Sequence, residues 1–131
     1  MLNEHPDSAR PEPIQGFRNH AQDYDGNSVA KTLGLKVSCV ARILGVYPST
    51  LSRNPASPKI RTQAVKLERV LSLLADLYGD LNYAVAWLKT PSALWSDAGD
   101  LSAFDLMMNE EWGLDFVLQT VEAMRRGDPL T

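Results

Sequence analysis

The sequence has little of what most catalytic or metal-binding sites need. It contains a single cysteine, Cys39, so it holds no internal disulfide and no multi-cysteine zinc site. Both histidines, His5 and His20, lie in a polar, proline-containing segment near the start of the chain, which is a poor place for a preorganised site. No apolar run approaches the roughly 18 residues that a membrane-spanning helix needs. We therefore expect a protein that is not an enzyme, uses no metal or cofactor and does not enter a membrane.

The first ten residues are polar and lack the apolar core of a secretory signal peptide, so we expect a cytoplasmic protein. Hydrophobic residues make up 44% of the 131 residues and charged residues 22%, which is ordinary for a globular chain. This length suits one compact domain or two very small ones.

The net charge of −3 hides a strong segregation of charge along the chain. Residues 1–26 hold two basic and five acidic residues, residues 27–70 hold eight and one, and residues 71–131 hold three and ten. The three segments therefore carry −3, +7 and −7. A basic block between acidic flanks favours a segment that binds a polyanion, although solvated helix faces of different sign would give the same counts.

Beyond residue 26 the apolar residues recur with the helical period, and alternation of period two is absent, so we predict an all-α fold. The first predicted helix is capped by Asn27 or Ser28 and ends before Gly34, and the second runs from Val37 to Leu44. The third starts at Pro48 and ends before Pro55. The spacing of Ser102 and Asp105 predicts a capping box at the start of a later helix. The remaining helices are predicted over Thr62–Tyr78, Leu81–Leu88, Ser102–Met108 and Trp112–Arg126. Residues 1–26 are predicted to be a flexible leader with one anchored aromatic, Phe17 or Tyr24.

Residues 37–53 have the pattern of a helix-turn-helix. Two helices that meet near a right angle need a small residue at the crossing, here Ala41, and a glycine at the sharp turn, here Gly45. They also need apolar residues that hold the second helix on the first, here Val46 and Leu51. A generic helical hairpin in a small bundle would use the same residue types.

A helix-turn-helix would present part of this segment to DNA. With Leu51 facing inward, the neighbouring side chains face outward toward base edges in the major groove, and flanking cations neutralise phosphates. The predicted base-reading residues are Ser49, Thr50, Ser52 and Arg53, and the predicted phosphate-binding residues are Lys36, Arg42, Lys59 and Arg61. Tyr47 takes the place of the usual Ser or Thr cap, which Pro48 partly offsets by presetting the backbone. Such a small DNA-binding domain is expected to act as a homodimer that binds two half-sites of the operator.

The C-terminal part carries all three tryptophans, Trp87, Trp95 and Trp112. Trp87 lies on a helical apolar stripe and is predicted to be core. Trp95 lies in a predicted loop, where a large aromatic either folds back onto the core or meets a partner. The sequence leaves both options open.

Residues 84–92 carry a more specific pattern, in which Trp87, Leu88, Thr90 and Pro91 stand at fixed spacing after Ala84. This stretch resembles the A-x-x-W-L-x-T-P-N signature of the toxin-binding domain in Xre/MbcA/ParS-type antitoxins, with serine in the last place. Together with the helix-turn-helix pattern, the resemblance covers roughly residues 28–130. It implies a DNA-binding domain over residues 27–78, which includes a long connecting helix, and a helical toxin-binding domain over residues 79–131.

The resemblance implies the antitoxin of a type II toxin–antitoxin system. Such a protein would occlude the active site of a RES-domain toxin that consumes NAD or transfers ADP-ribose from it, would bind operator DNA and would repress its own operon. It would form a higher complex with the toxin. Carried onto this sequence, the toxin contacts would be Trp95, Trp112, Phe116, Arg125, Arg126, Asp128, Pro129 and Leu130.

Two other functions compete with this one. The first is a stand-alone helix-turn-helix transcription regulator whose C-terminal half only dimerises. The second is a small enzyme, for which Cys39 is the sole candidate nucleophile; its place within an apolar helix instead predicts an inert thiol.

Overall fold

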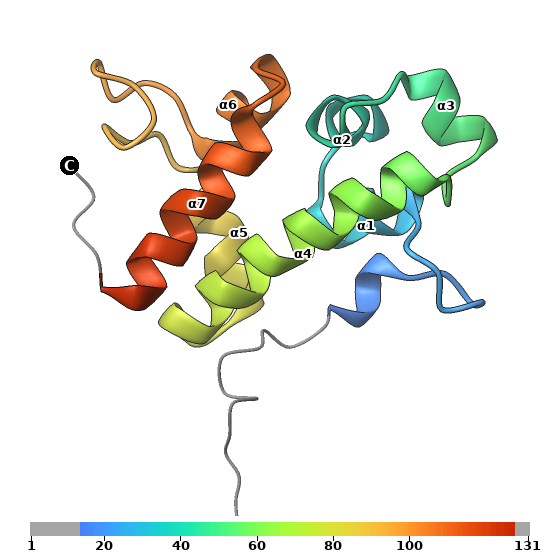
Figure 1. Cartoon of the computed structure of the whole chain (residues 1–131), viewed down its shortest axis with the longest axis horizontal. Coiled ribbons are helices and arrows are strands. Elements are labelled where there is room, and N and C mark those ends of the chain that lie inside the picture. The colour runs from blue at the N-terminus through green and yellow to red at the C-terminus, as the bar shows by residue number, and fades with distance from the viewer. Residues whose placement is uncertain (1–13, 128–131) are drawn as a thin grey trace, which may run out of the picture.

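The computed structural model of the chain describes residues 14–127, and every regular element in that range is a helix (Figure 1). The prediction of an all-α fold is therefore confirmed. The elements are the 3₁₀ helix η2 (Gln15–Phe17) and the α-helices α1 (Gly26–Leu33), α2 (Val37–Leu44), α3 (Pro48–Arg53), α4 (Pro58–Tyr78), α5 (Leu81–Lys89), α6 (Ala103–Asn109) and α7 (Gly113–Arg126).

The start of α1 is set by an acidic cap. The Asp25 carboxylate accepts hydrogen bonds from the backbone N–H groups of Asn27 and Ser28, at 3.0 and 3.1 Å. These bonds satisfy two donors that the first turn leaves free. The helix therefore begins at Gly26, and the prediction that Asn27 or Ser28 provides the cap is wrong.

The start of α4 is set by a serine and a proline. The Ser57 hydroxyl accepts a hydrogen bond from the Ile60 N–H, and Pro58 occupies the first helical position, where its missing N–H costs nothing. The long helix consequently begins at Pro58 and not near Thr62, because this proline opens α4 in addition to excluding a continuation of α3.

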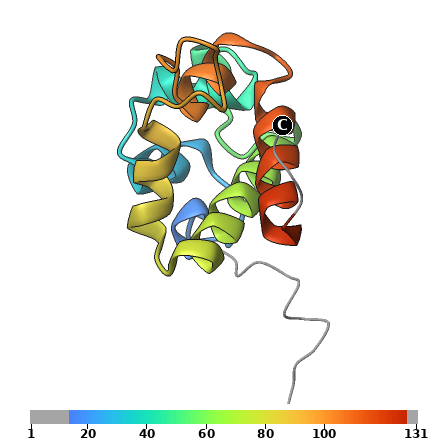
Figure 2. The same ribbon diagram turned by 90° about the vertical axis from the view of Figure 1, so that its left-hand side faces the viewer.

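Helix α4 is the central element of the fold. Figure 2 shows α5 and α7 on either side of its C-terminal part, and these two helices make its most extensive contacts. Near its N-terminal end, α4 packs against α1 and α2, and α2 also packs against α6. The buried side chains form one continuous core, which includes Ile60, Leu67, Leu71 and Leu74 of α4. Among residues 14–127, no helix combines the length and the apolar character needed to cross a lipid bilayer.

The described part of the predicted leader, residues 14–26, packs against the core. Phe17 is completely buried and Ile14 is almost so. The buried Glu68 carboxylate of α4 accepts hydrogen bonds from the Ile14 N–H, from Arg18 Nη1 and from the Tyr24 hydroxyl. Both candidate anchors, Phe17 and Tyr24, therefore contribute, and the segment is fixed across α1 and α4. Residues 1–13, including His5, lie outside the described residues.

Candidate functional site

The α2–α3 pair contains the four residues expected to shape its turn. Ala41 and Leu51 are completely buried, and Val46 is half-buried against the core. Gly45 follows α2 with φ +73°, a left-handed conformation that side chains other than glycine rarely adopt. The expected inward position of Leu51 is therefore confirmed, and residues 45–47 form the turn between α2 and α3.

The predicted base-reading residues lie on one short helix. In α3, the side chains of Ser49, Ser52 and Arg53 are exposed, whereas Thr50 is half-buried. Tyr47, directly before α3, makes no side-chain capping bond and is 79% exposed. An exposed tyrosine at this position adds a large ring and a hydroxyl donor to the surface that Ser49, Ser52 and Arg53 form.

The eight basic residues of segment 27–70 divide into two groups. Lys66 Nζ pairs with Asp115 Oδ1 at 2.9 Å, and Arg69 Nε pairs with Glu122 Oε2 at 2.7 Å, so both contribute to the α4–α7 contact. Within residues 14–127, the other six form no ion pair, and all six are exposed: Lys31, Lys36, Arg42, Arg53, Lys59 and Arg61.

The predicted phosphate-binding residues surround the α2–α3 pair. Lys36 precedes α2, Arg42 lies in α2, and Lys59 and Arg61 lie in the first turns of α4. A Cβ placed on Gly45 would lie 3.6 Å from Lys59 Cε, so the Lys59 side chain lies over the turn between α2 and α3. Lys59 therefore lies beside the α2–α3 pair in the structure, although Pro55 and Pro58 separate it from that pair in the sequence.

A small cleft adjoins these cations on the side of α6. Its volume is about 180 Å³, and Arg42 and Lys59 line it together with Asn109, Glu110 and Glu111. Arg42 Nη2 donates a hydrogen bond to Asn109 Oδ1 at 3.0 Å, which ties α2 to the end of α6. The two glutamates beside predicted phosphate contacts are missing from the sequence-based site, because nothing local in the sequence joins residues 110–111 to residue 42.

The predicted partner-binding surface keeps two of its aromatic residues. Trp112, which precedes α7, is 54% exposed, and Phe116 in α7 is 43% exposed. Their rings meet edge to face with centroids 5.8 Å apart. Trp95, in contrast, is only 7% exposed, and its ring packs edge to face on those of Trp87 and Phe116. Trp95 therefore folds back onto the core, and its assignment as a partner contact is wrong.

The aromatic contacts form an unbroken series across the C-terminal half. Tyr83 packs on Tyr78, Tyr78 on Trp87, Trp87 on Trp95, and Phe116 then joins Trp95 to Trp112. The rings at both ends of the series, Tyr83 and Trp112, are exposed. The half-buried Trp87 agrees with its predicted core position.

The charged residues predicted for the same surface lie elsewhere on α7. Arg125 follows Phe116 by nine residues, or about two and a half helical turns, so the two side chains leave opposite sides of the helix. Arg125 Nη2 instead pairs with Asp76 Oδ2 of α4 at 2.8 Å. Arg126 is exposed in the last turn. The remaining predicted contacts, Asp128, Pro129 and Leu130, lie outside the described residues.

The residues of the A-x-x-W-L-x-T-P pattern hold the fold together. Leu88 is completely buried, and Thr90 ends α5 while its hydroxyl donates to the Ala86 carbonyl oxygen at 2.7 Å. Ser92 then donates its N–H to the Leu101 carbonyl oxygen, which closes the loop that carries Trp95. Leu88 of this pattern therefore belongs to the core, whereas Thr90 and Pro91 are exposed where the loop begins.

Burial and hydrogen bonding perturb two titratable groups of the N-terminal segment. The hydrogen bond to Glu68 raises the pKa of Arg18, burial acts against it, and the charge of Glu68 adds to the rise. Burial raises the pKa of Tyr24, and the hydrogen bond and charge of Glu68 add to that effect. Both groups bond to the buried Glu68 of α4, so they fix the N-terminal segment on that helix.

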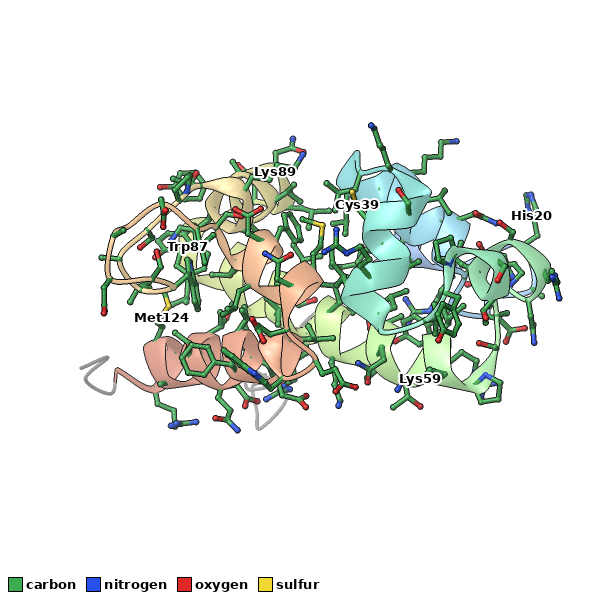
Figure 3. All side chains as sticks on the ribbon, turned by 90° about the horizontal axis from the view of Figure 1, so that it is seen from above. His20, Cys39, Lys59, Trp87, Lys89 and Met124 are labelled. Carbon is green, nitrogen blue, oxygen red and sulfur yellow. The ribbon has the colours of Figure 1, made fainter. Side chains whose placement is uncertain are left out.

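The described residues offer no cluster of three or more His, Cys, Asp or Glu side chains that could hold a metal ion. Cys39 is a half-buried free thiol on α2, and Figure 3 shows His20 at the far end of the molecule, apart from it. Figure 3 also places Lys59 and Trp87 in opposite halves of the molecule, so the cationic and aromatic surfaces are separate.

No protein-family model, curated protein or solved structure matches this chain.

Proposed function

We propose that this protein is a DNA-binding antitoxin. The α2–α3 pair binds operator DNA, and the exposed aromatic residues beside α7 bind a toxin of the RES-domain class. The observation that carries the proposal is the division of the basic residues: those facing α7 are paired, whereas those around α2 and α3 are exposed and without acidic partners in the described residues.

Unpaired cations around a small helix pair favour a polyanion as the ligand. Phosphate contacts supply most of the sequence-independent affinity for DNA, and base contacts add specificity. Arg53 is suited to base recognition because a guanidinium donates two parallel hydrogen bonds to a guanine edge. Since α3 spans only six residues, one copy offers few base contacts, and we propose that two copies bind two half-sites.

The acidic C-terminal half favours a second, protein partner. Trp112 and Phe116 expose aromatic surface of the kind that anchors protein interfaces, and Glu110, Glu111 and Asp115 are their sequence neighbours. A basic partner surface complements these charges. A RES-domain toxin, which the resemblance implies, would offer such a surface where it holds the pyrophosphate of NAD. Inhibition by occlusion requires no catalytic group from this protein.

Two variants test the two activities, because each is expected to impair one activity and to leave the other intact. Binding to a fluorescent duplex from upstream of the gene is measured by anisotropy, and binding to the neighbouring gene product is measured by co-expression and pull-down. Arg53→Gln is expected to weaken duplex binding and to leave the protein complex intact. The double variant Trp112→Ala/Phe116→Ala is expected to lose the protein complex and to keep duplex binding.

The alternative, a stand-alone regulator, predicts a different pattern. Under it, Arg53→Gln abolishes repression in cells, whereas Trp112→Ala/Phe116→Ala changes neither repression nor growth in the presence of the neighbouring gene. Absence of both duplex binding and a protein complex for the wild-type chain would refute the proposed function.

A further inference from the structure

Three lysines at the ends of different helices lie around the turn between α1 and α2. Gly34 forms this turn; Lys31 lies three residues before it, and Lys36 two residues after it. A Cβ placed on Gly34 would lie 3.9 Å from the Nζ atom of Lys89, the last residue of α5, so the Lys89 ammonium lies over the same turn. These three residues are called the α1–α2 lysine cluster below.

The backbone that carries the cluster is fixed on both sides. Gly34 has φ +65°, and the Leu35 N–H donates to the Ala30 carbonyl oxygen at 3.1 Å, while the Leu35 side chain packs against the core. Leu88, directly before Lys89, is completely buried and fixes the end of α5. The fold therefore brings together one lysine of the C-terminal half and two lysines of the basic segment.

The charges of the cluster are not balanced within the described protein. All three lysines are exposed, and within residues 14–127 none of them forms an ion pair. Helix dipoles account for Lys31 and Lys89, which lie in the last turns of α1 and α5. They do not account for Lys36, which stands at the start of α2, where a cation is disfavoured. Like charges around one turn repel each other, so this surface favours an anionic ligand.

The cluster extends the cationic surface around α2 and α3. Figure 3 shows Lys89 and Lys59 toward opposite edges of the molecule. Lys36 precedes the first turn of α2 and Arg42 lies in its last turn, so cations flank this helix at both ends. The eight residues of α2 span about 12 Å, which corresponds to roughly three to four base-pair steps of DNA. One duplex is therefore long enough to contact both ends of α2.

We propose that the α1–α2 lysine cluster is a second phosphate-binding surface for operator DNA, so that the DNA contact extends from α3 along α2 onto α5. This inference rests on the proposed function and deepens it, because it adds Lys31 and Lys89 to the phosphate contacts. It also assigns a DNA contact to the acidic C-terminal half. The two added contacts steepen the salt dependence by about 1.8 beyond the slope that the four predicted phosphate contacts set.

The test uses the full chain and three pairs of substitutions. Lys31→Gln/Lys89→Gln removes two charges of the cluster, and Lys31→Arg/Lys89→Arg keeps them. The control Lys66→Gln/Arg69→Gln also removes two positive charges, but from residues that pair with α7. Anisotropy of a labelled duplex from upstream of the gene is measured between 50 and 300 mM salt, and thermal unfolding checks that each variant is folded.

The glutamine pair is expected to make the slope shallower by about 1.8 per bound protomer and to weaken binding roughly 30-fold near 150 mM salt. Lys89→Gln alone is expected to account for about half of the change in slope, roughly 0.9. The arginine pair and the control pair are expected to change the slope by less than about 0.5, because neither removes a phosphate contact.

The outcomes separate the inference from the proposed function. If the wild-type chain binds the duplex and the glutamine pair keeps the wild-type slope, the inference is overturned and the proposed DNA binding stands. An equal change in the control pair also overturns it, because the effect then follows net charge and not position. If the glutamine pair keeps duplex binding but loses the complex with the neighbouring gene product, the cluster binds protein and the inference is overturned. If the wild-type chain binds no duplex even at 50 mM salt, both are overturned.

Discussion

The cations around α2 and α3 make a quantitative prediction about the salt dependence of DNA binding. Four of them are the predicted phosphate contacts: Lys36, Arg42, Lys59 and Arg61. If each neutralises one phosphate, the logarithm of the binding constant falls with the logarithm of salt concentration with a slope of about −3.6 per bound protomer. Affinity then drops roughly 150-fold between 50 and 200 mM salt.

Two lysines of α4 provide a matched test of this prediction. Lys59 is exposed beside the α2–α3 turn, whereas Lys66 lies two turns further along and pairs with Asp115. Lys59→Gln is expected to reduce the slope by about 0.9 per protomer and to weaken binding roughly fivefold near 150 mM salt. Lys66→Gln is expected to leave the slope unchanged.

The assay is fluorescence anisotropy of a labelled duplex at five salt concentrations between 50 and 300 mM. A wild-type slope shallower than about −1.8 would mean that fewer than two of these four cations contact phosphate. Equal slopes for Lys59→Gln and Lys66→Gln would refute the division into paired and unpaired cations as the basis of DNA binding.

Three further predictions concern the stability of the fold. Glu68→Ala removes the acceptor that three donors share and leaves buried groups unpaired. Urea unfolding should therefore show that the unfolding free energy falls by about 3–5 kcal/mol. A fall below about 1 kcal/mol would contradict these three hydrogen bonds. The pKa of Tyr24 is raised by burial, so its contribution to the unfolding free energy is complete below the ordinary value of about 10 and is lost as pH rises through the higher folded value. Unfolding measured from pH 8 to pH 11.5 should show this decline in the wild type and not in Tyr24→Phe. Trp95→Ala should lower the unfolding free energy by about 3–5 kcal/mol, because the ring is buried. Trp112→Ala should lower it by less than about 1 kcal/mol, because that ring is exposed. Equal losses for the two variants would indicate that both rings lie in the core.

The sequence predicts the helices well because their ends depend on local chemistry. Gly45 and Gly79 follow helices in the left-handed conformation, which their position after an apolar stripe predicts. Ser102 and Asp105 exchange hydrogen bonds at the start of α6, as their spacing predicts. In each case the interacting groups lie within one helical turn of each other, so a short stretch of sequence contains the whole interaction.

The sequence predicts less where the partner of a residue is far away along the chain. Arg18 and Tyr24 look like parts of a polar leader, but both bond to Glu68, the one acidic residue of the basic segment. The sequence does not decide whether Trp95 packs on the core or meets a partner, because its neighbours Trp87 and Phe116 lie on other elements. These contacts depend on how α4, α5 and α7 pack, and no local pattern encodes that packing.

The charge of each segment is similarly a poor guide to surface charge until the ion pairs are known. Lys66 and Arg69 contribute to the +7 of the middle segment, yet both are neutralised by acidic residues of α7. Glu110 and Glu111 contribute to the −7 of the last segment, yet they line a cleft with Arg42 and Lys59. The boundary between positive and negative surface therefore crosses α4 and the α6–α7 corner, and does not follow the boundary between segments.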